Sequence, residues 1–183
     1  VAPDSELDAA AAKRGFTAYL PGRTLPMLPP GLTRRISLSP EGESLSHSVL
    51  ITVERATGRI LRSRRCRARV RLAARLTFDE VQQAIDGKPP KQWPKPLART
   101  IADLVALTRS MRALRQREEA FLELATEEIR VIMEDGSESV RAIERRRQRQ
   151  ADQLVEECML AANVEVAREL IARHIPGLFR VHP

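Results

Sequence analysis

The chain has 183 residues, of which 43% are hydrophobic and 30% charged, and it carries a formal net charge of +7. This balance excludes a disordered chain, and no apolar run approaches the ~20 residues that a membrane-spanning helix needs. The length suits one domain. The surplus of Lys and Arg favours a polyanionic partner, because these side chains release counterions from phosphates when they bind them.

The two cysteines, Cys66 and Cys158, lie inside apolar patterns. This placement predicts free thiols in a reducing compartment, and hence a cytoplasmic protein with no membrane partner. The first residues lack the basic-then-apolar order of a signal peptide, and the chain does not begin with Met. We therefore expect it to be a segment excised from a longer polypeptide, with flanking parts of that polypeptide as partners.

The first part of the chain combines a short helix with a proline-rich segment. Residues 4–14 are alanine-rich behind a possible cap at Asp4 or Ser5, which predicts a short helix. Residues 15–32, GFTAYLPGRTLPMLPPGL, are dense in proline and glycine. This composition predicts an extended, stiff loop without a regular element.

Two hairpins and three further helices follow. Strands are predicted over residues 46–55 and 59–72, joined by the turn Ala56-Thr57-Gly58, and a second hairpin is predicted around the turn at 134–137. Helices are expected over 78–86, 97–118 and 148–173. The order of elements predicts an α+β fold in which long antiparallel hairpins pack with helices.

The second strand of the first hairpin carries a row of arginines. In RCRARVRL, Arg65, Arg67, Arg69 and Arg71 alternate with Cys66, Ala68, Val70 and Leu72, so the arginines share one face at a spacing of about 6.6 Å. Such a row can follow a phosphate backbone. The alternative is a solvated face that guards the sheet edge. The absence of acids from Arg59 to Arg75 favours RNA contact, and Arg75 is included in the predicted RNA-binding set.

The last helix contains QLVEECMLAAN, with two adjacent carboxylates in an apolar run. On a helical wheel, Glu157 falls beside Arg168, which predicts a solvated or ion-paired edge. Glu156 falls beside Asn163 among apolar neighbours and therefore needs a cation, a hydrogen-bond network or a ligand. The alternatives for Glu156 are a structural salt bridge to a core-facing arginine and a contact with substrate.

The sequence shows no complete active site. There is no G-x-S-x-G motif, no glycine-rich phosphate loop and no ligand spacing among the three histidines. The acidic pairs lack the close spacing of a two-metal site, so no metal ligand is predicted in this chain.

Four stretches, taken together and in order, resemble the central part of the RNB catalytic domain of the ribonuclease II and ribonuclease R family of 3′→5′ exoribonucleases. They are RGFTAYLPGRTLPMLP (14–29), ARLTFDEV (74–81), VEECMLAAN (155–163) and LFRVHP (178–183). The resemblance spans essentially residues 1–183, which correspond to only part of an RNB domain. It implies hydrolysis of single-stranded RNA to mononucleotides, with Mg²⁺ held by aspartates expected upstream of Val1.

The resemblance also assigns roles to residues of this chain. Tyr19 matches the tyrosine that stacks on the 3′-terminal base, and Glu156 or Glu157 matches a glutamate beside the 3′ nucleotide, with the wheel favouring Glu156 as the catalytic-site residue that positions the terminal ribose. Leu124 falls where some members of the family carry a phenylalanine that faces the stacking tyrosine. A one-sided aromatic contact puts the clamp on short end products in doubt for this chain. Two alternatives stay open, a catalytically silent RNB relative that binds RNA and a basic module that binds a ribosomal or protein partner. The 183-residue chain by itself is predicted to be inactive.

Overall fold

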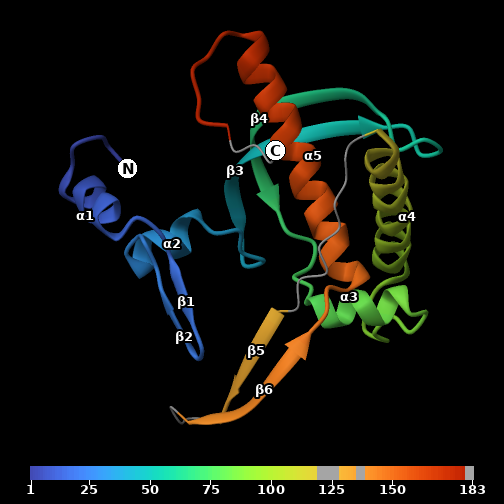
Figure 1. The fold of residues 1–183 in the computed structure, drawn as a ribbon, viewed down its shortest axis with the longest axis horizontal. Helices are drawn as coiled ribbons and strands as arrows, with labels where there is room; N and C mark the ends of the chain where they lie inside the picture. The colour runs from blue at the N-terminus through green and yellow to red at the C-terminus, as the bar shows by residue number, and fades with distance from the viewer. Residues whose placement is uncertain (119–127, 135–138, 180–183) are drawn as a thin grey trace. The chain divides into compact units, whose positions relative to one another are not determined.

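The computed structural model describes residues 1–118, 128–134 and 139–179 and confirms the α+β class. Helices and antiparallel two-stranded sheets alternate along the chain (Figure 1). The chain divides into two compact units, each of which is described by itself. Among the described helices, none is both long enough and apolar enough to cross a membrane.

The first unit comprises Val1–Leu45, Arg69–Ala73 and the described part of Thr126–Arg147. It holds two short helices and two antiparallel hairpins. Its elements are α1 (Glu6–Arg14), β1 (Ala18–Leu20), β2 (Arg23–Leu25), α2 (Pro30–Ile36), β5 (Glu128–Met133) and β6 (Val140–Arg146). Ser5 precedes helix α1 and its side chain accepts a hydrogen bond from the Asp8 backbone, so Ser5 rather than Asp4 is the cap.

The proline-rich segment corrects a prediction, because it contains regular elements. Strands β1 and β2 pair around Pro21-Gly22, with Leu20 opposite Arg23. Proline fixes its own φ, and Gly22 adopts φ +70°, which suits a tight turn. Pro30 then occupies the first position of α2, where its missing N–H is not needed. The prolines therefore start and connect elements rather than exclude them.

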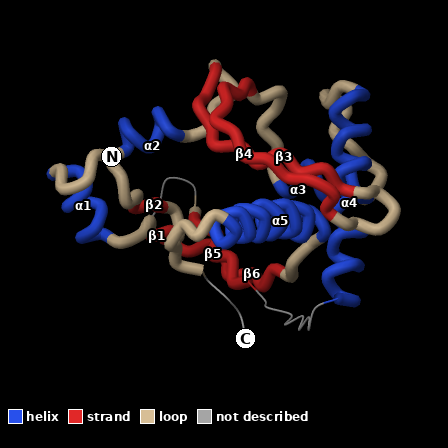
Figure 2. Tube along the Cα trace, turned by 90° about the horizontal axis from the view of Figure 1, so that it is seen from above, coloured by secondary structure: helices blue, strands red, loops and turns tan. Residues whose placement is uncertain are grey.

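The second unit comprises the described residues of Ser46–Ala68, Ala74–Ala125 and Gln148–Pro183. It holds most of the hairpin formed by β3 (Glu43–Val53) and β4 (Ile60–Arg71), together with three helices. These helices are α3 (Phe78–Ile85), α4 (Lys95–Glu118) and α5 (Gln150–Ala172), whose bounds lie within two residues of the predicted ones. Within this unit, α5 lies beside the hairpin (Figures 1 and 2). Helices α3 and α4 pack on α5 and on each other.

The turn of the first hairpin lies directly against α4. Gly58 is buried and adopts φ +77°, and a Cβ added to it would lie 2.4 Å from the backbone of Ser110. Only a residue without a side chain permits this approach. The predicted turn Ala56-Thr57-Gly58 is confirmed, and it anchors the hairpin to the helix.

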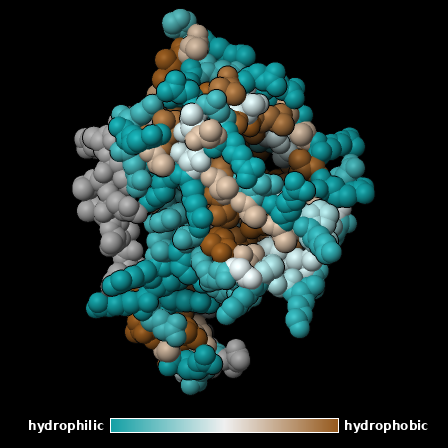
Figure 3. Space-filling view, turned by 90° about the vertical axis from the view of Figure 1, so that its right-hand side faces the viewer, coloured by the Kyte–Doolittle hydropathy of each residue, from teal (hydrophilic) through white to brown (hydrophobic). Residues whose placement is uncertain are grey.

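The buried side chains among the described residues belong to α4 and α5. They are Val105, Thr108, Ala151, Leu154, Glu157 and Ala161. Hydrophobic residues also gather in the middle of the face drawn in Figure 3, bordered by hydrophilic ones. The crossing of α4 and α5 is therefore the core of the second unit, and it contains a carboxylate.

Candidate nucleic-acid interface

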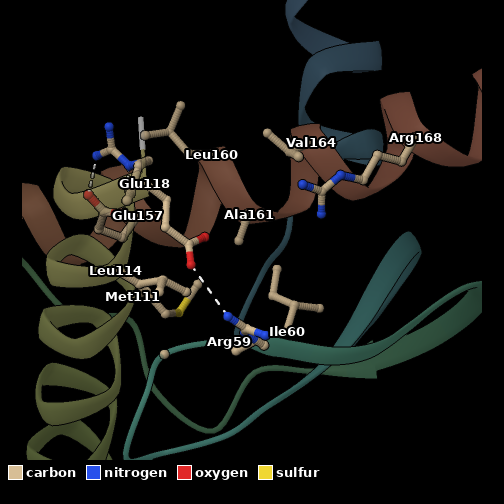
Figure 4. Close-up of a pocket in the computed structure, with 12 residues that line it drawn as sticks. Arg59, Ile60, Met111, Leu114, Glu118, Glu157, Leu160, Ala161, Val164 and Arg168 are labelled. Atoms are coloured by element: carbon tan, nitrogen blue, oxygen red, sulfur yellow. Dashed lines mark hydrogen bonds and ion pairs between the residues drawn. The ribbon is translucent and has the colours of Figure 1, made fainter. Parts of the chain in front are cut away.

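Glu157 is the buried carboxylate of α5, with only 3% of the residue exposed. Its Oε1 accepts hydrogen bonds from Arg112 Nη1 at 3.1 Å and from Arg115 Nη2 at 2.5 Å. Figure 4 shows Glu157 on the side of α5 that faces α4. A buried carboxylate is destabilising by several kcal/mol unless it is paired. The two arginines of α4 supply that pairing and fix α5 on α4.

This arrangement corrects the orientation predicted for α5. The wheel predicts a solvated or ion-paired edge for Glu157 beside Arg168. Glu157 is ion-paired, but on a buried side and with Arg112 and Arg115, whereas Arg168 pairs with Glu165 at 2.7 Å. The reason is physical: α5 is apolar in nearly every direction, so its own residues do not determine which side faces the core. The arginines at positions 112 and 115 determine it, and they lie on another helix.

Glu156 lies nearer the surface, with 41% of its side chain exposed. Its Oε2 accepts a hydrogen bond from Gln148 Nε2 at 2.8 Å and lies 3.7 Å from Arg112 Nη1. The ion pair considered for Glu156 is therefore a loose one, shared with Glu157. Asn163, two helical turns later, is exposed, as is Met159 between them. Glu156 and Asn163 remain accessible to a ligand on this side of α5.

The arginine face of β4 is displayed from Arg67 onward. Arg67, Arg69 and Arg71 are exposed, whereas Cys66, Ala68 and Val70 are half-buried, so the predicted alternation holds over this stretch. Arg69 and Arg71 lie 3.9 Å and 3.6 Å from carboxylate oxygens of Glu43. Exposed pairs of this kind contribute little and leave the guanidinium groups available. In the part of the chain that the structure describes, no ion pair involves Arg67, nor Arg75, which is also exposed.

Arg65 differs from the other arginines of the row. Its Nε donates to Glu169 Oε2 at 2.5 Å, and 21% of its side chain is exposed. This hydrogen bond raises the pKa of Arg65 and lowers the pKa of Glu169, which the charges of Arg173 and His47 lower further. Two residues earlier, Ser63 Oγ donates to Glu165 Oε2 at 2.5 Å. Arg65 is thus engaged with α5 before any ligand arrives.

Tyr19 is 81% exposed on β1, where its Cα lies opposite that of Thr24. The ring is presented to solvent, as a stacking platform requires. Tyr19 belongs to the first unit, whereas Glu156 and Asn163 belong to the second. Leu124 and the last four residues of LFRVHP lie outside the described residues.

Over residues 1–118, 128–134 and 139–179, no three His, Cys, Asp or Glu side chains form a group able to hold a metal ion. The described residues therefore do not fit the Mg²⁺ that the resemblance implies. Cys66 and Cys158 are free, and burial, followed by the charge of Glu157, raises the pKa of Cys158.

The sequence reasoning missed Arg112 and Arg115. Both interrupt the apolar period of α4, beside Met111 and Leu114. Two arginines three residues apart on one helix place their side chains on the same face. That spacing, set against a carboxylate in another apolar helix, is a signal that could have identified the pair.

Comparisons with known proteins agree with the arrangement of the elements. The profile described as the RNB domain matches residues 1–183. Ribonuclease R of Chlamydia muridarum is 32% identical over 183 residues, which cover all of this chain and 25% of that protein. Mycoplasma genitalium ribonuclease R, solved with ribose-methylated single-stranded RNA, superposes with a TM-score of 0.91 at 25% identity, over all of this chain and 28% of that one. Its complex with double-stranded RNA gives 0.92 at 25% identity, over all of this chain and 32% of that one.

The chain thus spans about a quarter of the length of the curated relatives it matches. The profile match is complete along the 183 residues, and the predicted resemblance is confirmed. The chain belongs to the RNB domain family.

Proposed function

We propose that this chain is a substrate-contacting part of an exoribonuclease that hydrolyses single-stranded RNA from its 3′ end to mononucleotides. The observation that carries the proposal is the RNB match over all of residues 1–183. The relatives named ribonuclease R and exoribonuclease 2 support it, as does the ribonuclease R solved with single-stranded RNA.

The surface of the chain offers three kinds of contact for such a strand. The exposed ring of Tyr19 stacks on the terminal base, because an aromatic face accepts any base. The carboxylate of Glu156 accepts hydrogen bonds from the terminal ribose hydroxyls, and Asn163 lies on the same side of α5. Arg67, Arg69, Arg71 and Arg75 neutralise phosphates, with Arg65 at the start of the row.

We propose further that the whole protein uses Mg²⁺, which, when bound, would supply a water activated for attack on the phosphodiester. The described residues do not form its site. The free thiols of Cys66 and Cys158 support a location in the cytoplasm, where thiols stay reduced. Fractionation of cells with an antibody against the protein tests that location.

The activity is tested with the full-length polypeptide that carries residues 1–183. A 5′-labelled single-stranded RNA is incubated with the protein and Mg²⁺, and we expect progressive shortening from the 3′ end together with release of mononucleotides. Chelation by EDTA stops the reaction, and added Mg²⁺ restores it. The isolated 183-residue chain is expected to leave the RNA intact.

Two other results assign the protein to the alternatives. RNA that is bound but stays at full length identifies a catalytically silent RNA-binding relative. RNA that is neither bound nor cut identifies a basic module for another partner. Either result removes the exoribonuclease proposal.

The role of Glu156 has its own test within this assay. Glu156→Gln keeps the shape of the side chain but weakens acceptance from ribose hydroxyls, so we expect a higher KM on RNA with a 3′-terminal ribose. The effect should disappear on RNA that ends in a 2′,3′-dideoxy nucleotide. Glu118→Gln, which removes another half-exposed carboxylate of an exposed pair, is the matched control. Equal effects of Glu156→Gln on both RNAs would exclude the ribose contact.

A further inference from the structure

A cationic depression lies where β4 meets the C-terminal half of α5. Its volume is about 470 Å³, and it is lined by four arginines and two glutamates, which leaves an excess of two positive charges. The charged residues are Arg64, Arg65, Glu165, Arg168, Glu169 and Arg173. We call this surface the α5–β4 depression. Of its residues, only Arg65 belongs to the RNA-binding set proposed above.

The two glutamates are held in place by β4. Ser63 and Arg65 are two residues apart on the strand, and they donate to Glu165 and Glu169, which are four residues apart on the helix. The helix spacing is about 6.0 Å and the strand spacing about 6.6 Å, so both hydrogen bonds form side by side. Each carboxylate therefore has a fixed position at the floor of the depression.

Each fixed carboxylate in turn holds an arginine of α5. Arg168 Nη1 lies 2.7 Å from Glu165 Oε1, and Arg173 Nη2 lies 2.8 Å from Glu169 Oε1. Their side chains are nevertheless 67% and 65% exposed. A guanidinium has five N–H donors in a rigid plane, and one carboxylate engages only some of them. The remaining donors face solvent from arginines whose conformations are already restricted.

We propose that the α5–β4 depression binds the phosphodiester backbone of the RNA, with Arg64, Arg168 and Arg173 contacting phosphates. The proposal rests on the proposed function and adds a phosphate-binding surface to it. An extended polyanion fits better than a single small anion, because the depression is open and the positive charge continues along β4. The next residue on that face of the strand is Arg67, which is exposed and unpaired within the described chain.

The test removes two charges from the depression. Arg168→Gln with Arg173→Gln is made in the full-length protein, and the control pair is Arg55→Gln with Arg99→Gln. The control removes the same charge from exposed arginines, of which Arg55 is also ion-paired, with Asp103. Binding of a fluorescent single-stranded RNA is measured in EDTA at several salt concentrations, and gels confirm that the RNA stays intact. Circular dichroism and the Tm confirm that each variant folds.

We expect the depression variant to give a shallower slope of log K against log salt, by about 1.4 for two lost phosphate contacts. The control pair should keep the wild-type slope. A slope for the depression variant equal to that of the control pair would overturn the proposal. Loss of affinity for poly-L-glutamate with an unchanged RNA slope would also overturn it, because it would identify a site for an acidic protein.

If the double variant does not fold, Arg64→Gln replaces it, with an expected change in slope of about 0.7. The outcomes separate this proposal from the proposed function. A wild-type protein that degrades RNA, with unchanged slopes in these variants, removes only the depression as a binding surface. If the wild-type protein binds no RNA, both the depression proposal and the proposed function are wrong.

Discussion

Glu157 and Arg115 join α5 to α4 through an ion pair whose Oε1 and Nη2 atoms lie 2.5 Å apart, at a carboxylate that is 4% exposed. Arg112 completes the pairing from one helical turn earlier. The same Arg112 lies 3.7 Å from Glu156. The side chain proposed to touch RNA therefore sits beside the pair that fixes its helix.

Removal of the buried carboxylate should destabilise the fold strongly. Glu157→Ala leaves Arg112 and Arg115 without their buried partner, and we expect a loss of about 3 kcal/mol. Glu156→Ala, at the neighbouring and half-exposed position, should cost less than about 1 kcal/mol. Urea unfolding of the full-length protein measures both. Equal losses at the two positions would contradict the assignment of Glu157 as the structural carboxylate.

A methyl group at the turn of the first hairpin should separate the hairpin from α4. Gly58→Ala places a Cβ 2.4 Å from the Ser110 backbone, and the alanine must also adopt the positive φ of this position. At Gly87 the φ is similar, +81°, but no atom lies within 4 Å of an added Cβ. Gly87→Ala therefore measures the cost of the backbone strain without the steric clash. We expect about 1 kcal/mol of destabilisation for Gly87→Ala and a distinctly larger loss for Gly58→Ala. Thermal unfolding compares the two, and equal shifts in Tm would contradict the close packing.

The pairing of Glu169 should make stability depend on pH in the acid range. Because the folded pKa of Glu169 lies below its ordinary value near 4.3, the folded state binds fewer protons than the unfolded state in the window between the two values. The stabilisation is complete above that ordinary value and is lost as the pH falls through the lowered pKa. The raised pKa of Arg65 has no effect in this range, because that group stays protonated throughout.

Wild type and Glu169→Gln should therefore differ in unfolding free energy at pH 7 and converge as the pH falls below about 4. Glu41→Gln, at an exposed residue for which the described structure shows no ion pair, is the control and should follow the wild-type curve. Chemical unfolding over pH 3–7 provides the comparison. A constant difference at every pH would show that the pair contributes no proton linkage.

Arg67 should contribute to RNA binding through charge alone. Arg67→Gln removes an exposed arginine from the predicted face of β4, and we expect the salt slope of single-stranded RNA binding to fall by about 0.7. Arg62→Gln removes an exposed arginine at a position that alternation assigns to the other face of the same strand. A filter-binding series in EDTA distinguishes them. Similar slopes for the two variants would favour the alternative in which these arginines only solvate the sheet.

Tyr19 should matter for the end of the RNA and not for the fold. Tyr19→Ala removes a ring that is 81% exposed, so the Tm should stay within a degree or two, whereas binding of short RNA should weaken by about 1–3 kcal/mol through lost stacking. Tyr19→Phe keeps the aromatic face and should bind like wild type. A loss of affinity in Tyr19→Phe equal to that in Tyr19→Ala would point to the hydroxyl instead.

Local patterns predicted the elements well, because their signals lie within single segments. The turn at Gly58 and the alternation of Arg67 with Ala68 are visible in a few consecutive residues. Proline content alone predicts the wrong structure for the proline-rich segment, because it does not show where each proline lies within an element. The positions of Pro21 and Pro30, at a turn and at a first helical residue, are compatible with short elements.

The orientation of α5 could not be obtained in the same way. A helix that is apolar on most sides presents several possible buried faces, and the choice depends on a neighbour that is distant in sequence. Glu157 is inside because Arg112 and Arg115 meet it from 42 to 45 residues away. The same limit applies to Arg65, whose separation from the rest of its row depends on Glu169, 104 residues later.

The number of side-chain pairs that can form between β4 and α5 is also limited. Four helical residues advance about 6.0 Å, whereas two strand residues advance about 6.6 Å. Each further side-chain pair is therefore displaced by about 0.6 Å relative to the one before it. The first two pairs are Ser63–Glu165 and Arg65–Glu169. The third would pair Arg67 with Arg173, but α5 ends at Ala172, and Arg173, its C-cap, already pairs with Glu169. The side-chain pairing between the two elements therefore ends with Arg65 and Glu169.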